Sequence, residues 1–224
     1  MFDKKDWQAA LVQCGINKGD NLIISGTLLN DDLTIDGWPT ILDACLGMVG
    51  IEGTIMTIVK NQRSEPIHHD HTLSKNQRDK LIKAWSQSSY PLITASALEN
   101  AFFFHDEVRS IIHPGYRFYA IGKYAPFMVR KVSKHFPLHD DGPLQAAIKL
   151  KTKCLHFGDE EPWLIEAFHA SAIQVNQGVH HIDGIARWEL FLDKEASEVS
   201  VPYQAWTLNE EKVRYYEFNQ HPSH

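Results

Sequence analysis

A single histidine stands in the stretch WLIEAFHASA, which runs from Trp163 to Ala172 and otherwise reads as the buried start of a helix. A histidine ring accepts and releases protons near neutral pH, which suits it to general base catalysis. A histidine on an apolar face can equally be a core residue whose ring is hydrogen-bonded. The stretch alone leaves both interpretations of His169 open.

Acidic side chains that could orient such a ring follow further along the chain, at Glu189, Asp193 and Glu195. If residues 187–195 form a strand, these three carboxylates share one face, because side chains alternate with a period of two. One of them could accept a hydrogen bond from the ring of His169. The alternative is an exposed acidic edge.

The cluster HHDH, from His68 to His71, is the obvious candidate for a metal site. It lies in the polar stretch NQRSEPIHHDHTLSKNQ, which predicts a surface loop. Adjacent histidines on an irregular segment rarely converge on one ion without a further ligand and an ordered second shell. We therefore expect no metal, and interpret the cluster either as a solvated loop or as a polar lip that contacts a substrate.

Strands that alternate with helices must position these residues. The stretch DGWPTILDACLGMVG predicts a helix, with Pro39 near its first turn and Gly50 past its end. It lies between the apolar strands 21–25 and GTIMTIVK, so the three elements form a βαβ unit. The fold class that follows is α/β, an α/β/α sandwich with a mixed, largely parallel central sheet, and residues 1–224 form one domain. The remaining predicted helices cover residues 6–14, 75–88, 96–105, 124–134 and 143–149, and the remaining strands cover 116–121, 153–157, 179–193 and 198–206.

Composition excludes several classes of function. The chain of 224 residues has a formal net charge of -6 and so lacks the basic excess that binding to a nucleic-acid backbone requires. Cys14, Cys45 and Cys154 lie in apolar runs without CxxC spacing, which predicts reduced core thiols. No apolar stretch resembles a signal peptide or approaches the roughly 18 residues of a membrane span. We expect a cytoplasmic protein with neither nucleic acid nor membrane as a partner.

Common catalytic motifs are absent from the sequence. It has no GxSxG elbow, no phosphate-binding P-loop, no GxGxxG after a strand and no HExxH. A cysteine nucleophile would need an electropositive and accessible setting, whereas Cys14 and Cys154 lie in apolar patterns. A hydrolase is therefore disfavoured.

Five blocks of sequence do occur in a recognisable order: CGINKGDNLIISGTLLND, IDGWPTILDACLGMVGIEGTIMTIV, TASALEN, RSIIHPGYRFYAIGKYA and KCLHFGDEEPWLIEAFHASA. In this order they resemble the aminoglycoside 3-N-acetyltransferase family, also called antibiotic N-acetyltransferases, over residues 5–175. The resemblance implies an N-acyltransferase that uses acetyl-CoA or another acyl-CoA as co-substrate and no metal. Its partner would be a small-molecule amine, such as an amino sugar. A homodimer is left open.

The resemblance also implies roles for individual residues. His169 matches the histidine that serves as general base in the family's LHLAE-like block, and Asp193 matches its acidic region, with Glu189 as a second candidate. The acyl-CoA would contact a set of six residues, its arm lying along Ser25, Gly26 and Thr27 and its phosphates near Arg109, Ser110 and His113. Backbone N–H groups around Gly26 and Thr27 could donate to the thioester oxygen. Apart from the resemblance, a cationic acceptor would suit a pocket lined with carboxylates, and the stretches EPIHHDH and TASALEN together carry carboxylates and histidines. We therefore expect the acceptor to contact Asp70, His71, Ser96 and Glu99.

The chain departs from the family pattern at several of these positions. The family strand reads HSSL where this chain has SGTL, so that Ser25 replaces a histidine. Ala172 replaces a glutamate three residues after the base, and Arg117 replaces a serine. These changes keep open a second hypothesis, a catalytically impaired relative that acts as a binding or scaffold protein. Within the enzyme hypothesis, the mixture of acidic residues and histidines favours a biosynthetic amino sugar as the acceptor over an antibiotic.

Overall fold

The structure is a computed structural model that describes residues 1–28, 34–60, 96–113, 115–133, 137–138, 142–158, 164, 167–168, 187–192 and 198–203. Its helices are α1 (Lys4–Gln13), α2 (Trp38–Val49), the short 3-10 helix η2 (Gly50–Glu52), α4 (Ala97–Phe103), α5 (Ala125–Met128) and α6 (Pro143–Lys149). Its strands are β1 (Asn21–Gly26), β2 (Thr54–Lys60), β3 (Arg109–His113), β4 (Tyr116–Gly122), β5 (Lys153–Phe157), β6 (Arg187–Leu192) and β7 (Glu198–Tyr203).

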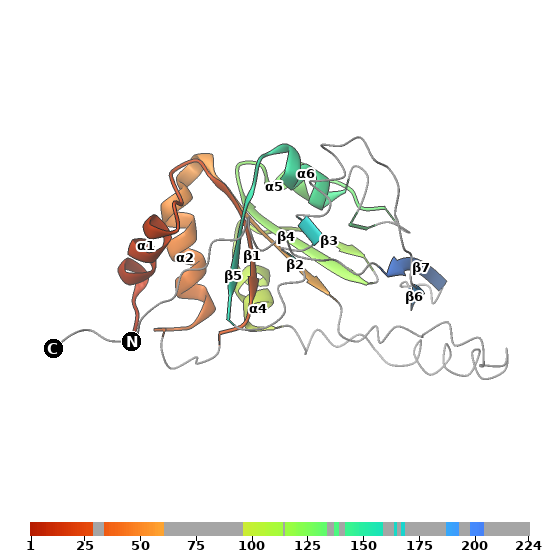
Figure 1. Cartoon of the computed structure of the whole chain (residues 1–224), viewed down its shortest axis with the longest axis horizontal. Coiled ribbons are helices and arrows are strands. Elements are labelled where there is room, and N and C mark those ends of the chain that lie inside the picture. Colours follow the sequence, from red (N-terminus) through yellow and green to blue (C-terminus); the bar gives the residue numbers. More distant parts are fainter. Residues whose placement is uncertain are drawn as a thin grey trace.

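Five of these strands form one mixed sheet in the order β3-β4-β2-β1-β5 (Figure 1). Strand β1 pairs in parallel with both β2 and β5, whereas β4 pairs antiparallel with β2 and β3. All strands of this sheet except β4 therefore run in one direction, which confirms the predicted mixed, largely parallel sheet. Strands β6 and β7 form a separate antiparallel pair.

Helices cover both faces of the sheet. Leu22 and Ile24 of β1 belong to one buried cluster with side chains of α1, α2 and α4. Ile23 belongs to a second cluster with side chains of α5 and α6. The alternation along β1 thus directs neighbouring apolar residues into two helical layers, and the predicted α/β/α sandwich is confirmed (Figure 1).

Local signals explain the first two helices. Asp3 caps α1, since its carboxylate accepts from the backbone N–H groups of Lys5 and Asp6 while Asp6 returns a bond to the Asp3 N–H. In α2, Pro39 lies in the first turn and Gly50 is the C-cap with φ 64°. Both helices lie where the sequence predicts them.

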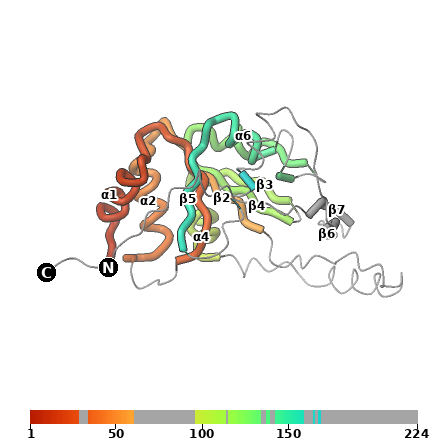
Figure 2. Tube along the Cα trace, in the orientation of Figure 1, coloured from red at the N-terminus to blue at the C-terminus, as the bar shows by residue number. Residues whose placement is uncertain are grey.

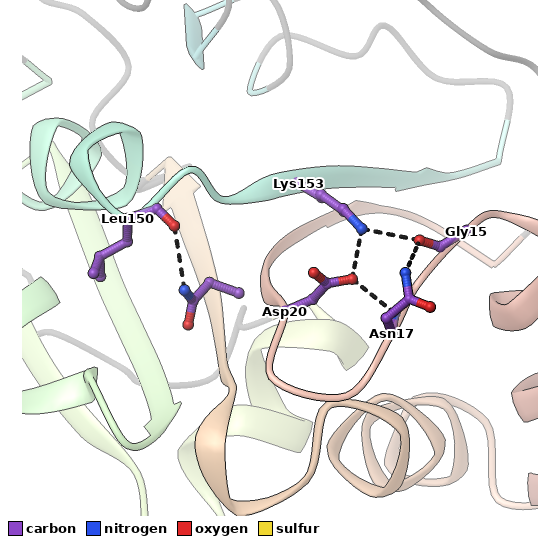
Figure 3. Close-up of polar contacts among 6 residues, drawn as sticks. Gly15, Asn17, Asp20, Leu150 and Lys153 are labelled. Atoms are coloured by element: carbon purple, nitrogen blue, oxygen red, sulfur yellow. Dashed lines mark hydrogen bonds and ion pairs between the residues drawn. The ribbon is translucent and has the colours of Figure 1, made fainter.

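Hydrogen bonds and an ion pair connect the amino ends of β1 and β5, as Figure 3 shows. Lys153 Nζ, at the start of β5, lies 2.6 Å from Asp20 Oδ2 and donates to the Gly15 carbonyl at 2.9 Å. Asn17 N–H donates to the same Asp20 oxygen at 2.7 Å. Figure 2 shows the two strands running side by side from this point. The two strands stay paired to their carboxyl ends, which carry Ser25 and Gly26 on β1.

Two predicted elements differ from the structure. Residues 109–113, where the sequence predicts no strand, form β3, a short edge strand whose residues are mostly exposed and so lack an apolar alternation. The helix predicted over 124–134 is wrong beyond Met128, because Val129 leaves the helical conformation at φ -109°, ψ 27°. The predicted helix over 75–88 lies outside the described residues.

Candidate functional site at the carboxyl ends of β1 and β5

The chain leaves strands β1 and β5 toward opposite faces of the sheet. After β1 it forms α2, which packs in the cluster of Leu22 and Ile24. After β5 it reaches Leu164 and Ala167, which pack in the cluster of Ile23. Adjacent parallel strands whose connections diverge in this way form a switch point, and ligands in open α/β sheets bind outside the carboxyl ends of such strands. The carboxyl ends of β1 and β5 are therefore the candidate site.

A serine and a histidine meet at this position. Ser25 on β1 pairs directly with His156 on β5, and Ser25 Oγ lies 3.0 Å from His156 Nδ1. Ser25 is buried, with 7% of its surface exposed, and His156 is half-buried. Alternation places both side chains on the face of Ile23 and Cys154, the face on which Leu164, Ala167 and Phe168 pack. Sequence reasoning missed His156, although a polar residue near the end of each of two apolar strands was a usable signal.

Glycines bring the two strand ends into close contact just beyond this pair. Gly26 has φ 107°, and a Cβ on it would lie 1.9 Å from the carbonyl oxygen of Phe157. A Cβ on Gly158 would lie 2.4 Å from the Thr27 carbonyl. Thr27 N–H donates to the Phe157 carbonyl at 3.0 Å. This N–H is therefore engaged within the sheet, and the expectation that it donates to a thioester oxygen has to be given up for Thr27.

The cysteines of the chain are free thiols. Burial raises the pKa of Cys45 and that of Cys154 to about 12, and burial also raises the pKa of Cys14. All three thiols are therefore protonated at neutral pH, which is unfavourable for a nucleophile. Cys154 lies two residues before His156 on the same face of β5. Of these two side chains, only His156 remains a candidate for acid–base chemistry.

The predicted phosphate contacts lie on β3, which β4 and β2 separate from β1. His113 ends this strand on the same face and at the same end of the sheet as Ser25, is buried, and accepts from the Gly115 N–H through Nδ1 at 3.0 Å. Arg109 begins the strand, is exposed, and lies in the same row across the sheet as Ile23. Among the described residues it forms no ion pair with Asp106 or Glu107. The structure thus brings His113 to the end of the sheet where Ser25 lies and leaves Arg109 farther back on the same face. Ser110 pairs with Tyr119 and therefore lies on the opposite face.

A second polar group lies on the opposite face, beneath α4. Glu99 is 1% exposed and accepts from the Tyr119 hydroxyl at 2.8 Å through Oε1. Arg117 Nε lies 2.8 Å from the same oxygen, an ion pair without hydrogen-bond geometry. Ser96 caps α4, because its Oγ accepts from the Glu99 N–H at 3.2 Å. We call Glu99, Arg117 and Tyr119 the α4 network.

Ionisation in the α4 network is constrained by burial. Burial, the hydrogen bond to Glu99 and the charge of Glu99 together raise the pKa of Tyr119 far above its usual value. Glu99 Oε2 and Thr57 Oγ1 are buried without a hydrogen-bond partner among the described residues. Ser96 and Glu99 therefore have structural roles in α4, and their contact with a substrate stays a prediction.

Several predicted site residues lie outside the described residues: His169, Asp193, Asp70 and His71. Glu189 lies in β6 opposite Val201, and its side chain is not described. Within the described ranges, no three His, Cys, Asp or Glu side chains are grouped so as to hold a metal ion. No helix in those ranges is long and apolar enough to cross a membrane.

Comparison with known proteins identifies relatives of the chain. A family model described as aminoglycoside 3-N-acetyltransferase matches residues 34–163, more than half of the chain. No curated protein matches it. Solved structures with a similar fold include the YokD protein from Bacillus subtilis, at 18% identity and a TM-score of 0.66, over 94% of this chain and 84% of that one.

Two further solved structures share the fold. Aminoglycoside acetyltransferase AAC(3)-Xa is 15% identical, with a TM-score of 0.66 over 97% of this chain and 78% of that one. AAC-IIIb, described as binary with CoASH, is 15% identical, with a TM-score of 0.63 over 89% of this chain and 75% of that one. These likenesses show the fold.

Proposed function

The chain belongs to the aminoglycoside 3-N-acetyltransferase family, and we propose that it transfers an acetyl or other short acyl group from acyl-CoA to an amine of an amino sugar. The observation that carries this proposal is the switch point at the carboxyl ends of β1 and β5. It presents Ser25 and His156 at the position where open α/β sheets bind ligands, in a chain whose family name is an acetyl-transfer activity.

In this proposal the acyl-CoA arm lies along Ser25, Gly26 and Thr27. The solved structure of AAC-IIIb with CoASH supports acyl-CoA as the co-substrate. His113, at the same end of the sheet, is the member of the predicted phosphate site best placed to reach the same molecule. Arg109 lies farther back on this face of β3, and Ser110 lies on the opposite face. Backbone N–H groups at a helix start could complete the phosphate contacts.

Acyl transfer to an amine requires the amine to lose a proton. With an ordinary pKa of about 10.4, roughly one amine in 10³ is neutral at pH 7. We assign the proton acceptor to His169, with Asp193 or Glu189 as the carboxylate that orients its ring. Support comes from Phe168, the preceding residue, which packs on the face of the sheet that carries Ser25. A positioned base typically contributes about 10²- to 10⁴-fold in rate.

The acceptor in this proposal is a biosynthetic amino sugar that contacts Asp70 and His71, and the reaction takes place in the cytoplasm. The predicted contacts with Ser96 and Glu99 are not part of it, because Glu99 is 1% exposed and lies beneath α4 on the face of the sheet opposite Ser25. The family name supports an amino-sugar amine, since aminoglycosides carry such amines. The overall charge of -6 is compatible with a cationic acceptor.

A scaffold protein remains the second candidate function. It is favoured by the substitution of Ser25 for the histidine of the family pattern and of Ala172 for its glutamate. Such a protein would retain the fold and a ligand cleft without transferring acyl groups.

The test is acetyl transfer from acetyl-CoA to a panel of aminoglycosides and simpler amino sugars, read by the mass of the acceptor and by release of free CoA. We expect mass gain on at least one acceptor. Binding of acetyl-CoA in a calorimeter without transfer to any acceptor would favour the scaffold, and absence of both would remove the proposal.

The variant His169→Ala tests the assignment of the base. We expect kcat to fall by about 10² to 10⁴, with the melting temperature and the acetyl-CoA affinity unchanged, because only the transition state uses the proton acceptor. A core histidine would give the opposite result, early melting with a normal rate per folded molecule.

A further inference from the structure

The chain has an imidazole at the candidate site that the proposed function does not use. His156 lies on β5 and pairs directly with Ser25 on β1. The Ser25 Oγ to His156 Nδ1 distance of 3.0 Å shows that the two side chains meet. An imidazole therefore lies at the carboxyl ends of β1 and β5, beside the proposed position of the acyl-CoA arm.

The contact with Ser25 suits a ring that changes protonation state. A hydroxyl can both donate and accept a hydrogen bond. It therefore donates to Nδ1 when that nitrogen is unprotonated and accepts from Nδ1–H when that nitrogen carries a proton. The ring keeps its position in both states.

Among the residues that the structure describes, the other ionisable groups on this face of the sheet are less suited to the same task. Cys154 on β5 has a pKa raised to about 12 by burial and stays protonated. Lys60, Tyr116, His113 and Arg109 share the face but lie on β2, β4 and β3. Lys149 of α6 precedes β5 and lies toward the amino end of that strand. The described residues after β5 on this face are Leu164, Ala167 and Phe168, which carry no charge.

We propose that His156 donates a proton to the sulfur of CoA as the acyl group leaves, and that Ser25 is the residue that positions its ring. This inference rests on the proposed function, in which the thioester end of the arm lies beside Ser25. The acceptor nitrogen forms a bond to the acyl carbon, the carbon–sulfur bond breaks, and the sulfur keeps the electron pair. The amine proton goes to His169, and the sulfur takes its proton from Nε2 of the His156 imidazolium, so that free CoA leaves as the thiol. Solvent then takes the proton from His169 and returns one to His156.

The pH dependence of kcat separates the two histidines. A reaction that needs one group deprotonated and another protonated has a bell-shaped profile, in which the base sets the acidic limb and the acid sets the alkaline limb. His156→Asn is the informative variant, because the asparagine amide can keep a bond to Ser25 but cannot deliver a proton near neutral pH. We expect kcat to fall by about 10²-fold, the alkaline limb to disappear and the acetyl-CoA affinity to stay unchanged.

A second variant, Ser25→Ala, keeps the imidazole and removes its hydroxyl partner. We expect kcat to fall by roughly tenfold, as for loss of one hydrogen bond, and the alkaline limb to move, because the imidazole has lost its hydroxyl partner. Ser25→Thr retains the hydroxyl and should restore the wild-type limb.

The outcomes distinguish this inference from the proposed function. A wild-type protein that transfers no acyl group at any pH overturns the proposed function. An active wild type whose alkaline limb survives in His156→Asn, or stays in place in Ser25→Ala, overturns the role of His156 alone. Loss of the acidic limb in His156→Asn would show that His156 accepts the amine proton, and would also overturn it.

Discussion

Two polar groups occupy opposite faces of the same sheet, and they differ in almost every physical respect. Ser25 Oγ lies within hydrogen-bond distance of His156 Nδ1 at the carboxyl ends of parallel strands, and the histidine is half-buried. In the α4 network, Glu99 is 1% exposed and holds both Tyr119 and Arg117 against one oxygen.

This contrast separates a group arranged for chemistry from a group arranged for stability. Breaking one partner of a buried ion pair is costly, because the remaining charge is left uncompensated in a low-dielectric interior. One hydroxyl–imidazole hydrogen bond changes the free energy of unfolding by only about 1 kcal/mol, so this contact contributes little to the stability of the fold. We therefore expect substitutions in the α4 network to change stability and substitutions at the β1–β5 ends to change activity.

The largest expected effect on stability is that of Glu99→Ala. It leaves the Arg117 guanidinium and the Tyr119 hydroxyl without their shared acceptor, and should lower the free energy of unfolding by about 4 kcal/mol in urea titration. The exposed Glu107→Ala on the following turn is the control and should stay within about 0.5 kcal/mol of wild type. A Glu99→Ala protein of normal stability but impaired kcat would place the α4 network in the active site and reverse the comparison.

Gly26→Ala changes the carboxyl ends of β1 and β5 and should lower the free energy of unfolding by about 3 kcal/mol. The new Cβ would lie 1.9 Å from the Phe157 carbonyl oxygen, so the ends of β1 and β5 must separate. Gly15→Ala is a matched control, since Gly15 also has positive φ, at 75°, but no atom within 4 Å of the added Cβ; it should cost roughly 1 kcal/mol.

The rate of acyl transfer per folded molecule, measured for Gly26→Ala and Gly15→Ala, tests whether the carboxyl ends of β1 and β5 form the active site. Gly26→Ala should lose acyl transfer even where it is fully folded, because Ser25 and His156 move apart, whereas Gly15→Ala should keep the wild-type rate. Equal rates in the two variants would contradict a role for the β1–β5 ends.

Apart from the controls, Tyr119→Phe has the smallest expected effect on the free energy of unfolding, about 2 kcal/mol near neutral pH for a hydrogen bond to a charged group. The pKa of Tyr119 is raised in the folded state, chiefly by burial, so the neutral phenol stabilises the fold. This contribution is complete below the unfolded pKa of about 10 and is lost as the pH rises beyond it. Urea titrations at pH 7 and pH 11 should therefore show the wild-type advantage over Tyr119→Phe shrinking at the higher pH. A constant advantage would contradict the burial of this phenol.

Local patterns in the sequence were sufficient to predict most of the sandwich. Strand β1 and helix α2 are determined by their own apolar spacing, with Pro39 and Gly50 marking the ends of the helix. Strand β3 escaped prediction because an exposed edge strand of five residues carries little apolar pattern. Its existence depends on pairing with β4, which sequence spacing does not show.

The candidate site could be predicted only in part, because its contacts are non-local. Ser25 was identified through the family resemblance, but its partner His156 lies 131 residues away and is brought to it by the parallel pairing of β1 and β5. Glu99 was predicted to contact a substrate from its charge alone, whereas its burial against Tyr119 and Arg117 depends on the packing of α4 on the sheet.

A crystal structure of the protein with CoA bound tests the location of the site most directly. We expect the pantetheine arm to lie along Ser25, Gly26 and Thr27 with its sulfur beside His156, and the α4 network to be unchanged from the free protein. A CoA molecule bound against α4, with its sulfur far from the ends of β1 and β5, would contradict the account.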